Sequence, residues 1–247
     1  MARNDVEARI SSPQRPAARP LLSPAARRPA LVALAACVAI TAFFGLLFAH
    51  HAQPSWLDSA IDSRIRAGLG GHRVLLGRVA RLGTPVPMAV MTAALVLACL
   101  ATRRWRGALL VAIAVPAAEV ITEYLLKPLV GRTLGGNLVF PSGHTTGVFT
   151  LAAVATVLLT GPLRPPLPRA VRWSLVVAAC VVASATATAM IALGYHYFTD
   201  TVGGAAVAIG TVLATALTLD KLTAPDRHSG PARPERPGPR RLRAGEP

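Results

Sequence analysis

Long apolar runs, separated by short segments rich in arginine, form the dominant pattern of this sequence. A helix rises about 1.5 Å per residue, so about 20 apolar residues cross the hydrocarbon core of a bilayer. Six runs approach that length, at 31–49, 86–101, 108–126, 147–163, 174–193 and 202–219. The pattern predicts an all-α, polytopic membrane protein with six transmembrane helices.

The two ends of the chain lack apolar periodicity and are rich in arginine and proline. We expect residues 1–30 and 220–247 to be disordered basic tails around a six-helix membrane domain at 31–219. The first tail and the run after it resemble a signal peptide. However, the basic stretch is long and no clear small-residue cleavage site follows, so we expect this run to be retained as the first span.

The net charge of +15 raises the question of nucleic-acid binding. The arginines flank apolar runs, a position that favours contact with anionic lipid headgroups instead. The few aromatic residues (Trp 3, Tyr 3, Phe 6) are not interleaved with basic stretches as in a stacking platform. We therefore expect a lipid bilayer as partner and no nucleic acid. Because the three cysteines are far apart in sequence, we expect neither a disulfide nor a cysteine-based metal site.

The distribution of charge also predicts an orientation. With six spans, the side that holds both tails carries 19 Lys and Arg, and the other side carries 7. The positive-inside rule then places both termini in the cytoplasm and the loops at 50–85, 127–146 and 194–201 outside. The Ala, Arg and Pro content is typical of a GC-rich bacterial genome, which favours the bacterial cell membrane.

The first outward loop shows an i, i+4 recurrence of apolar residues from Leu57 to Leu69. This spacing predicts an amphipathic helix on the membrane surface, ended by the glycines at 68, 70 and 71. A simple connector between two spans is the alternative.

The second outward loop brings together residues suited to a phosphate group. Lys127 and Arg132 supply positive charge to pair with a phosphate. Ser142 and Gly143 precede a predicted helix, whose free amides and dipole favour an anion. His144 follows, placed to donate a proton to a leaving oxygen. The alternatives are an ordinary N-cap and turn at Ser-Gly, and anchoring of the two cations to lipid headgroups.

The third outward loop contains His196 and Asp200 at i, i+4 spacing, so both lie on one face if the segment is helical. A carboxylate that binds one ring nitrogen leaves the other free to attack phosphorus, which predicts a phosphohistidine at His196. A polar cap at a helix end is the alternative role for a single histidine. Glu119 and Glu123 in or near the third run either pair with a cation or line a proton path.

These motifs resemble the type-2 phosphatidic acid phosphatase superfamily, which also includes vanadium haloperoxidases. Pro141–His144 matches the family's Pro-Ser-Gly-His motif in full, and His196-x-x-x-Asp200 is similar to its third motif. The resemblance spans roughly residues 30–220. It implies a six-helix fold in which His144 is the acid, His196 the nucleophile and Asp200 its orienting group. It also implies that Lys127, Arg132, Ser142 and Gly143 hold the phosphate.

Two positions depart from the family's pattern. Leu134 stands seven residues after Lys127, where the family usually has an arginine, and Arg132 resembles an earlier arginine of the same stretch. Met190 stands six residues before His196, where another arginine is usual. Since cations stabilise the transferring phosphoryl group, both changes bear on the rate.

The resemblance thus implies metal-independent hydrolysis, without cofactor, of a membrane lipid phosphate or diphosphate. Phosphatidic acid, phosphatidylglycerol phosphate and polyprenyl phosphates are the substrate types considered. Two alternatives remain: a lipid phosphotransferase that uses the same site, and a non-catalytic lipid-binding or transport protein that keeps the fold.

Overall fold

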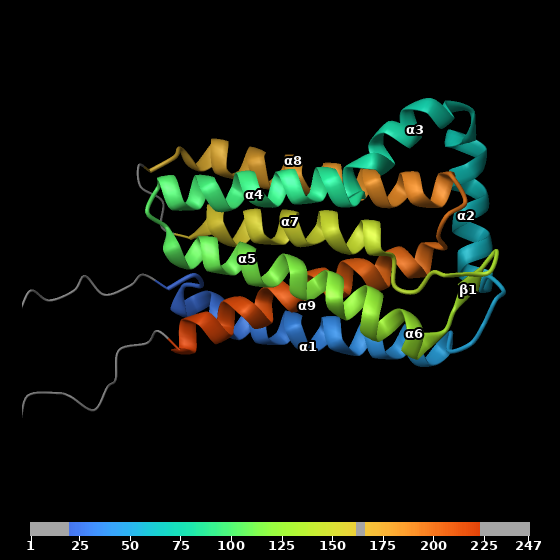
Figure 1. Cartoon of the computed structure of the whole chain (residues 1–247), viewed down its shortest axis with the longest axis horizontal. Helices are drawn as coiled ribbons and strands as arrows, with labels where there is room; N and C mark the ends of the chain where they lie inside the picture. Colours follow the sequence, from blue (N-terminus) through green and yellow to red (C-terminus); the bar gives the residue numbers. More distant parts are fainter. Residues whose placement is uncertain (1–19, 162–165, 223–247) are drawn as a thin grey trace, which may run out of the picture.

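The computed structural model describes residues 20–161 and 166–222. Long helices lie side by side along one axis, and two short helices cross one end of the bundle (Figure 1). The α-helices are α1 (Pro24–Leu47), α2 (Trp56–Leu69), α3 (Arg73–Ala80), α4 (Pro85–Ala101), α5 (Trp105–Val120), α6 (Lys127–Val130), α7 (Gly143–Thr160), α8 (Arg169–Ala192) and α9 (Phe198–Leu222). Short helical turns η1 (Gly70–His72), η2 (Arg81–Gly83) and η3 (Ile121–Leu126) continue some of them.

The predicted polytopic helical fold is confirmed within the described residues. Five helical segments are long and apolar enough to cross a membrane. A sixth span is formed if α4 is taken together with the helical segment before it, at a bend of 52°. The predicted third run is one continuous segment, 105–130, made of α5, the π-helical turn η3 and α6. The chain is therefore a multi-pass membrane protein.

The first predicted boundary is wrong by several residues. Helix α1 begins at Pro24, inside the stretch predicted to be a disordered tail. The Ser23 side chain accepts a hydrogen bond from the amide of Ala26, and Pro24 occupies the first helical position, where its missing N–H costs nothing. Helix α9 likewise continues to Leu222. The rest of the two predicted tails, 1–19 and 223–247, lies outside the described residues.

Helix α7 lies at the centre of the bundle and contacts α5, α8 and α9. Its most apolar stretch is 56% buried, whereas that of α1 is only 11% buried. Large apolar side chains such as Val32, Phe43 and Leu46 are exposed on α1. In a bilayer these side chains face lipid, so exposure is the expected arrangement rather than a defect.

A two-stranded hairpin interrupts the otherwise helical fold, which the prediction of an all-α chain did not include. Strands β1 (Thr133–Leu134) and β2 (Asn137–Leu138) pair antiparallel. Gly135 and Gly136 have positive φ angles of 57° and 82°, the conformation that a two-residue hairpin turn requires. The hairpin directs the chain from α6 toward the start of α7.

The predicted helix of the first outward loop is present as α2, at the end of the bundle where α6, β1 and the start of α9 also lie (Figure 1). Its buried residues, however, are Asp58 and Asp62, not apolar side chains. The acidic face of α2 therefore lies against the protein, and Trp56 is 82% exposed. This face contributes to the site described below.

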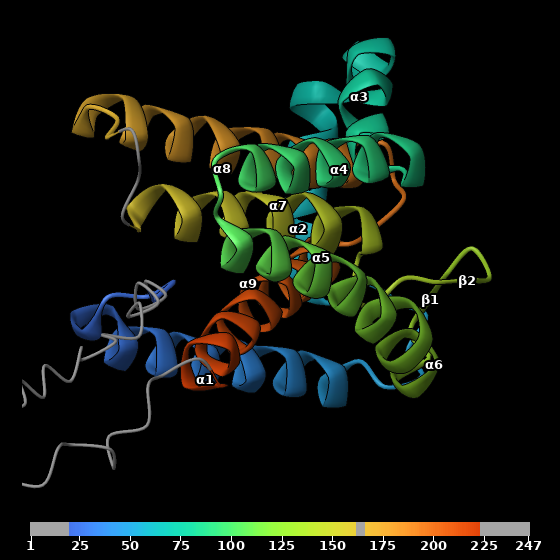
Figure 2. The ribbon, with the colours of Figure 1, turned by 60° about the vertical axis from the view of Figure 1, so that its left-hand side comes forward.

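The opposite end of the bundle is held by a buried carboxylate. Figure 2 shows the start of α1 and the end of α9 close together at this end. Asp220 accepts hydrogen bonds from the amides of Leu21 and Leu22, at 2.7 and 2.9 Å, and from the guanidinium of Arg106 at 2.5 Å. One side chain thus joins three segments that are far apart in sequence.

We expect Asp220→Asn to lower the thermal stability of the purified protein by several degrees without a change at the far end of the bundle. The substitution removes the negative charge that three donors share in a buried position. The measurement is the melting temperature in detergent. An unchanged melting temperature would show that the hydrogen bonds accepted by Asp220 contribute nothing to stability.

Candidate functional site

The Pro-Ser-Gly-His segment forms the start of α7 and packs closely on α9. Ser142 caps the helix by accepting a hydrogen bond from the amide of Thr145, and its own amide donates to the carbonyl of Asp200 at 3.0 Å. A Cβ on Gly204 would lie 2.7 Å from the carbonyl oxygen of Ser142. Only a glycine at position 204 allows α9 and the Pro-Ser-Gly-His segment to lie this close together.

His144 projects from the first turn of α7 at the edge of the bundle. Its backbone and side chain lie against η2, because a Cβ on Gly83 would be 2.9 Å from the Cβ of His144. His144 and His196 lie close enough to interact electrostatically, as do His144 and Lys127. The structure therefore brings the two predicted histidines to one place, although their loops are about 50 residues apart in sequence.

His196 lies just before α9 and is 7% exposed. Its Nδ1 is 3.6 Å from Oδ2 of Asp200, which also accepts the amide of Tyr197 at 2.9 Å. The two side chains thus lie near each other as predicted, but Nδ1 of His196 makes no hydrogen bond to Asp200 in this structure, and His196 precedes the helix. Burial, together with the nearby carboxylates, raises the pKa of Tyr197, so its phenol stays a neutral donor to the carbonyl of Ala52.

Lys127 lies beside the start of α7 and is paired with Glu123. Their Nζ and Oε2 atoms are 2.7 Å apart, and both side chains lie against the Cα of Gly143. One turn earlier, Glu119 lies against Gly147. Of the two roles considered for the glutamates, pairing with a cation is the one that Glu123 has here.

The π-helical turn η3 explains why these three side chains share a face. The amide of Lys127 donates to the carbonyl of Thr122, five residues earlier. In an α-helix, residues four apart point in slightly different directions, because one turn holds fewer than four residues. A π turn holds more residues per turn and reduces this difference in direction. Glu119, Glu123 and Lys127 therefore all face α7.

Arg132 has a different environment from the one predicted. Its side chain is fully buried, and its guanidinium donates to Asp58 and Asp200 at 2.7 and 2.6 Å and to Thr199 at 2.7 Å. The rings of Phe48 and Tyr197 cover its two faces, at 3.9 and 4.5 Å from the guanidinium carbon. The guanidinium is committed to protein groups, so we do not carry its predicted phosphate contact into the proposal below.

Asp58 is a member of this site that the sequence did not reveal. Its Oδ1 accepts the amide of Thr199 at 2.9 Å, and its Oδ2 accepts Ser55 as well as Arg132. Two signals were present in the sequence: the capping-box pattern Ser55-x-x-Asp58, and a second acid, Asp62, one turn later. Neither signal says that this face points inward.

The two positions that depart from the family's pattern lie in apolar or peripheral surroundings. Met190 is 3% exposed and packs with Leu76 and Ala80 of α3. Leu134 lies in the hairpin. Helix α3 covers Met190, so this position offers an apolar side chain in place of a cation.

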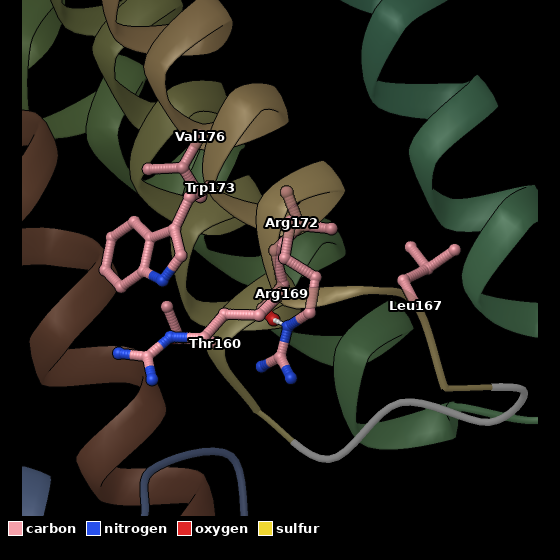
Figure 3. A pocket seen from close by; sticks show the side chains of 7 residues that line it. Thr160, Leu167, Arg169, Arg172, Trp173 and Val176 are labelled. Carbon is pink, nitrogen blue, oxygen red and sulfur yellow. Dashed lines mark hydrogen bonds between the residues drawn. The ribbon is translucent and has the colours of Figure 1, made fainter.

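Two other features were considered as binding sites. Among the described residues, no group of three His, Cys, Asp or Glu side chains is arranged to hold a metal ion. A cavity of about 290 Å³ lies at the end of α7 opposite the histidines, between α7 and α8 (Figure 3). It is lined by Leu159, Thr160, Leu167, Arg169, Arg172, Trp173 and Val176. Helix α7 spans about 24 Å between the two, so this cavity is separate from the histidine site.

Comparison with known proteins identifies the segment that carries the site. Residues 120–224 match the family model of the PAP2 superfamily. This segment is therefore similar to the PAP2 superfamily. The match includes Lys127, the Pro-Ser-Gly-His motif and the His196–Asp200 pair, and it confirms the resemblance inferred from those motifs.

The solved structures extend the PAP2 likeness from the segment to the fold. The crystal structure of the first transmembrane PAP2 type phosphatidylglycerolphosphate phosphatase from Bacillus subtilis matches with a TM-score of 0.58 at 17% identity. The alignment covers 77% of this chain and 98% of that chain. A search of curated proteins finds no match. The shared feature at this level of identity is the fold.

We expect Gly204→Ala to abolish or strongly reduce any activity of the site, because the added methyl group would push the Pro-Ser-Gly-His segment away from α9. Gly210→Ala on the same helix is the matched control, since its Cβ would meet only the Cβ of Cys37 at 3.3 Å and Leu34 at 3.7 Å. Phosphate release is the measurement. Equal activity in both variants would contradict the close approach at Gly204.

Proposed function

We propose that this protein hydrolyses a membrane lipid phosphate or diphosphate through a phosphohistidine intermediate. The observation that carries the proposal is the convergence of three elements: the His196–Asp200 pair, His144 on the first turn of α7, and Lys127 against Gly143. The similarity of the segment to the PAP2 superfamily supports it.

The proposed reaction has two steps, and the proton given up in the first is regained in the second. In the first, Nε2 of His196 attacks phosphorus, the bond to the lipid oxygen breaks, and His144 donates a proton to that oxygen. In the second, His144 takes a proton from water, the hydroxide attacks phosphorus, and the bond to His196 breaks. Asp200 keeps the Nδ1 proton of His196 in place and stabilises the positive ring of the intermediate.

Phosphate binding is assigned to Lys127, Gly143 and Ser142. The amides of the first helical turn have no partner within the helix and point at a ligand beyond its end, where the dipole also favours negative charge. Ser142 holds that turn in place as the N-cap. Lys127 adds a full positive charge once its ammonium group turns from Glu123 to the phosphate.

The substrate is proposed to be a lipid because the site lies at the end of a bundle whose outer surface is apolar. Its hydrocarbon tail then remains in the bilayer while the phosphate reaches α7. The neighbour from Bacillus subtilis, described as a phosphatidylglycerolphosphate phosphatase, supports this class. We place the site on the outer face and both termini in the cytoplasm from the excess of basic residues on the opposite side.

One observation favours a second candidate, a non-catalytic lipid-binding protein. Met190 replaces a cation of the family's pattern, and its surroundings are apolar. A phosphotransferase would use the same phosphohistidine with a different acceptor. Both candidates are separated from hydrolysis by the product: inorganic phosphate from a hydrolase, a new phosphate ester from a transferase, and neither from a binding protein.

We expect His196→Ala to reduce phosphate release from a panel of lipid phosphates by at least about 10³-fold, because no nucleophile remains to form the intermediate. Protein incubated with ³²P-labelled substrate and quenched in alkaline detergent, in which a phosphohistidine survives, should carry label in the unsubstituted form and in Asp220→Asn. His196→Ala should carry none.

His72→Ala, in the exposed turn η1, is the matched control and should keep full activity. Unchanged phosphate release in His196→Ala would overturn the mechanism. Absence of any phosphate release by the unsubstituted protein, across the panel, would overturn the proposed function.

We expect Glu123→Gln to lower KM for the lipid phosphate by roughly threefold, because the amide no longer competes for Lys127 or repels the phosphate. The value of kcat should change less. Glu119→Gln, one turn away and without the contact to Lys127, is the control. A rise in KM would show instead that Glu123 positions Lys127 for the phosphate.

A further inference from the structure

We propose that Asp58 and Arg132 are positioning residues that act on His196 through Asp200. Asp58, Arg132 and Asp200 form a continuous carboxylate–guanidinium–carboxylate chain, with contacts of 2.7 and 2.6 Å and no exposed side-chain surface in any of the three. The proposal rests on the proposed function, in which Asp200 orients the nucleophile. It adds a pair of residues that lie beyond the His196–Asp200 dyad.

The geometry of the Asp58–Arg132–Asp200 chain leaves the Asp200 side chain little freedom. Nη1 of Arg132 binds Oδ1 of Asp200 and also the hydroxyl of Thr199. The other oxygen, Oδ2, accepts the amide of Tyr197 and lies toward Nδ1 of His196. With one oxygen held by Arg132, the carboxylate plane is fixed, and the direction in which Oδ2 faces His196 is fixed with it.

Arg132 is in turn held from every side. The rings of Phe48 and Tyr197 restrict the guanidinium to one plane. Nη2 binds Oδ2 of Asp58, which is itself fixed by Ser55 and by the amide of Thr199. Helix α2 is therefore attached to the first turn of α9 by the same carboxylate that fixes Arg132.

The charges of the chain suit the chemistry proposed for His196. Two carboxylates and one guanidinium leave a net charge of about −1 in a buried place, where charge interactions are strong. A neutral His196 leaves this charge uncompensated, and a positive ring, protonated or phosphorylated, compensates it. The chain thus favours the intermediate over the resting state.

Without the carboxylate of Asp58, the full charge of Arg132 falls on Asp200. Asp200 then attracts the positive ring of His196 less, and the site becomes nearly neutral before the reaction starts. The other charged or titratable groups around this pair are Asp62 and Arg66 on α2, His144 on α7 and Tyr197 before α9.

Asp62 provides a matched control for Asp58. Both residues lie on α2, both are buried, and each accepts a backbone amide at the start of α9: Asp58 from Thr199 and Asp62 from Phe198. Asp62 pairs with Arg66 and does not contact Arg132. A purely structural role for these carboxylates would therefore affect Asp58→Asn and Asp62→Asn alike.

The test compares the two variants in full-length protein, with phosphate release, melting temperature and pH profile measured for each. In Asp58→Asn we expect kcat to fall about tenfold with KM little changed. In the pH profile of kcat/KM, the acidic limb should move to lower pH by about one unit, since the positive form of His196 is less favoured. In Asp62→Asn we expect both kcat and the limb to stay near those of the unsubstituted protein.

A second readout does not depend on activity. The titration of His196 is followed by NMR of ¹⁵N-histidine-labelled protein, with His196→Gln used for assignment. The midpoint should move to lower pH in Asp58→Asn and stay in place in Asp62→Asn.

Equal midpoints in Asp58→Asn and the unsubstituted protein would overturn the positioning role, even if lipid phosphates are hydrolysed. If no lipid phosphate is hydrolysed but the midpoint shifts as expected, the proposed function fails and the positioning of His196 stands.

Discussion

One buried guanidinium fixes the arrangement of the end of the bundle that carries the two histidines. Arg132 binds the carboxylates of Asp58 and Asp200 with no exposed surface on any of the three side chains. These residues come from α2, from the loop before the hairpin and from α9, which are separated by up to about 140 residues. A buried charge of this kind is tolerated only when its partners surround it, so the three segments must assemble together.

The same interaction decides what the site has available for a phosphate. Because Arg132 is used inside the protein, and because Met190 packs against α3, the positive charge at the start of α7 comes from Lys127. Lys127 is itself paired with Glu123 before a ligand arrives. Under the proposed function, helix amides and the ammonium group of Lys127 would hold the phosphate, so binding would depend strongly on the geometry of α7.

The surroundings of the two histidines follow from the two environments, lipid and water, that meet at this end of the bundle. Apolar side chains on α1 and the other long helices face outward, where lipid requires no polar partner. Polar groups gather inside the bundle end, where α2 covers them and glycine at 204 allows α9 to meet the start of α7. Under the proposed function, the phosphate would reach the histidines at this end of the bundle while the lipid tail stays beside the helices.

The sequence by itself determined the helices and singled out the candidate residues. Apolar runs predict spans because hydrophobicity is a local property, and His196 and Asp200 predict a pair because four residues make about one helical turn. Pro141–His144 predicts the start of α7 for the same local reason. What only the tertiary structure decided is which distant charges meet. Nothing within α2 shows that Asp58 faces inward, and nothing near Arg132 shows that its partner lies 74 residues earlier. The sequence around an arginine beside a phosphate-binding motif is the same whether the arginine binds a ligand or two buried carboxylates. The difference depends on the space that the other helices leave around it.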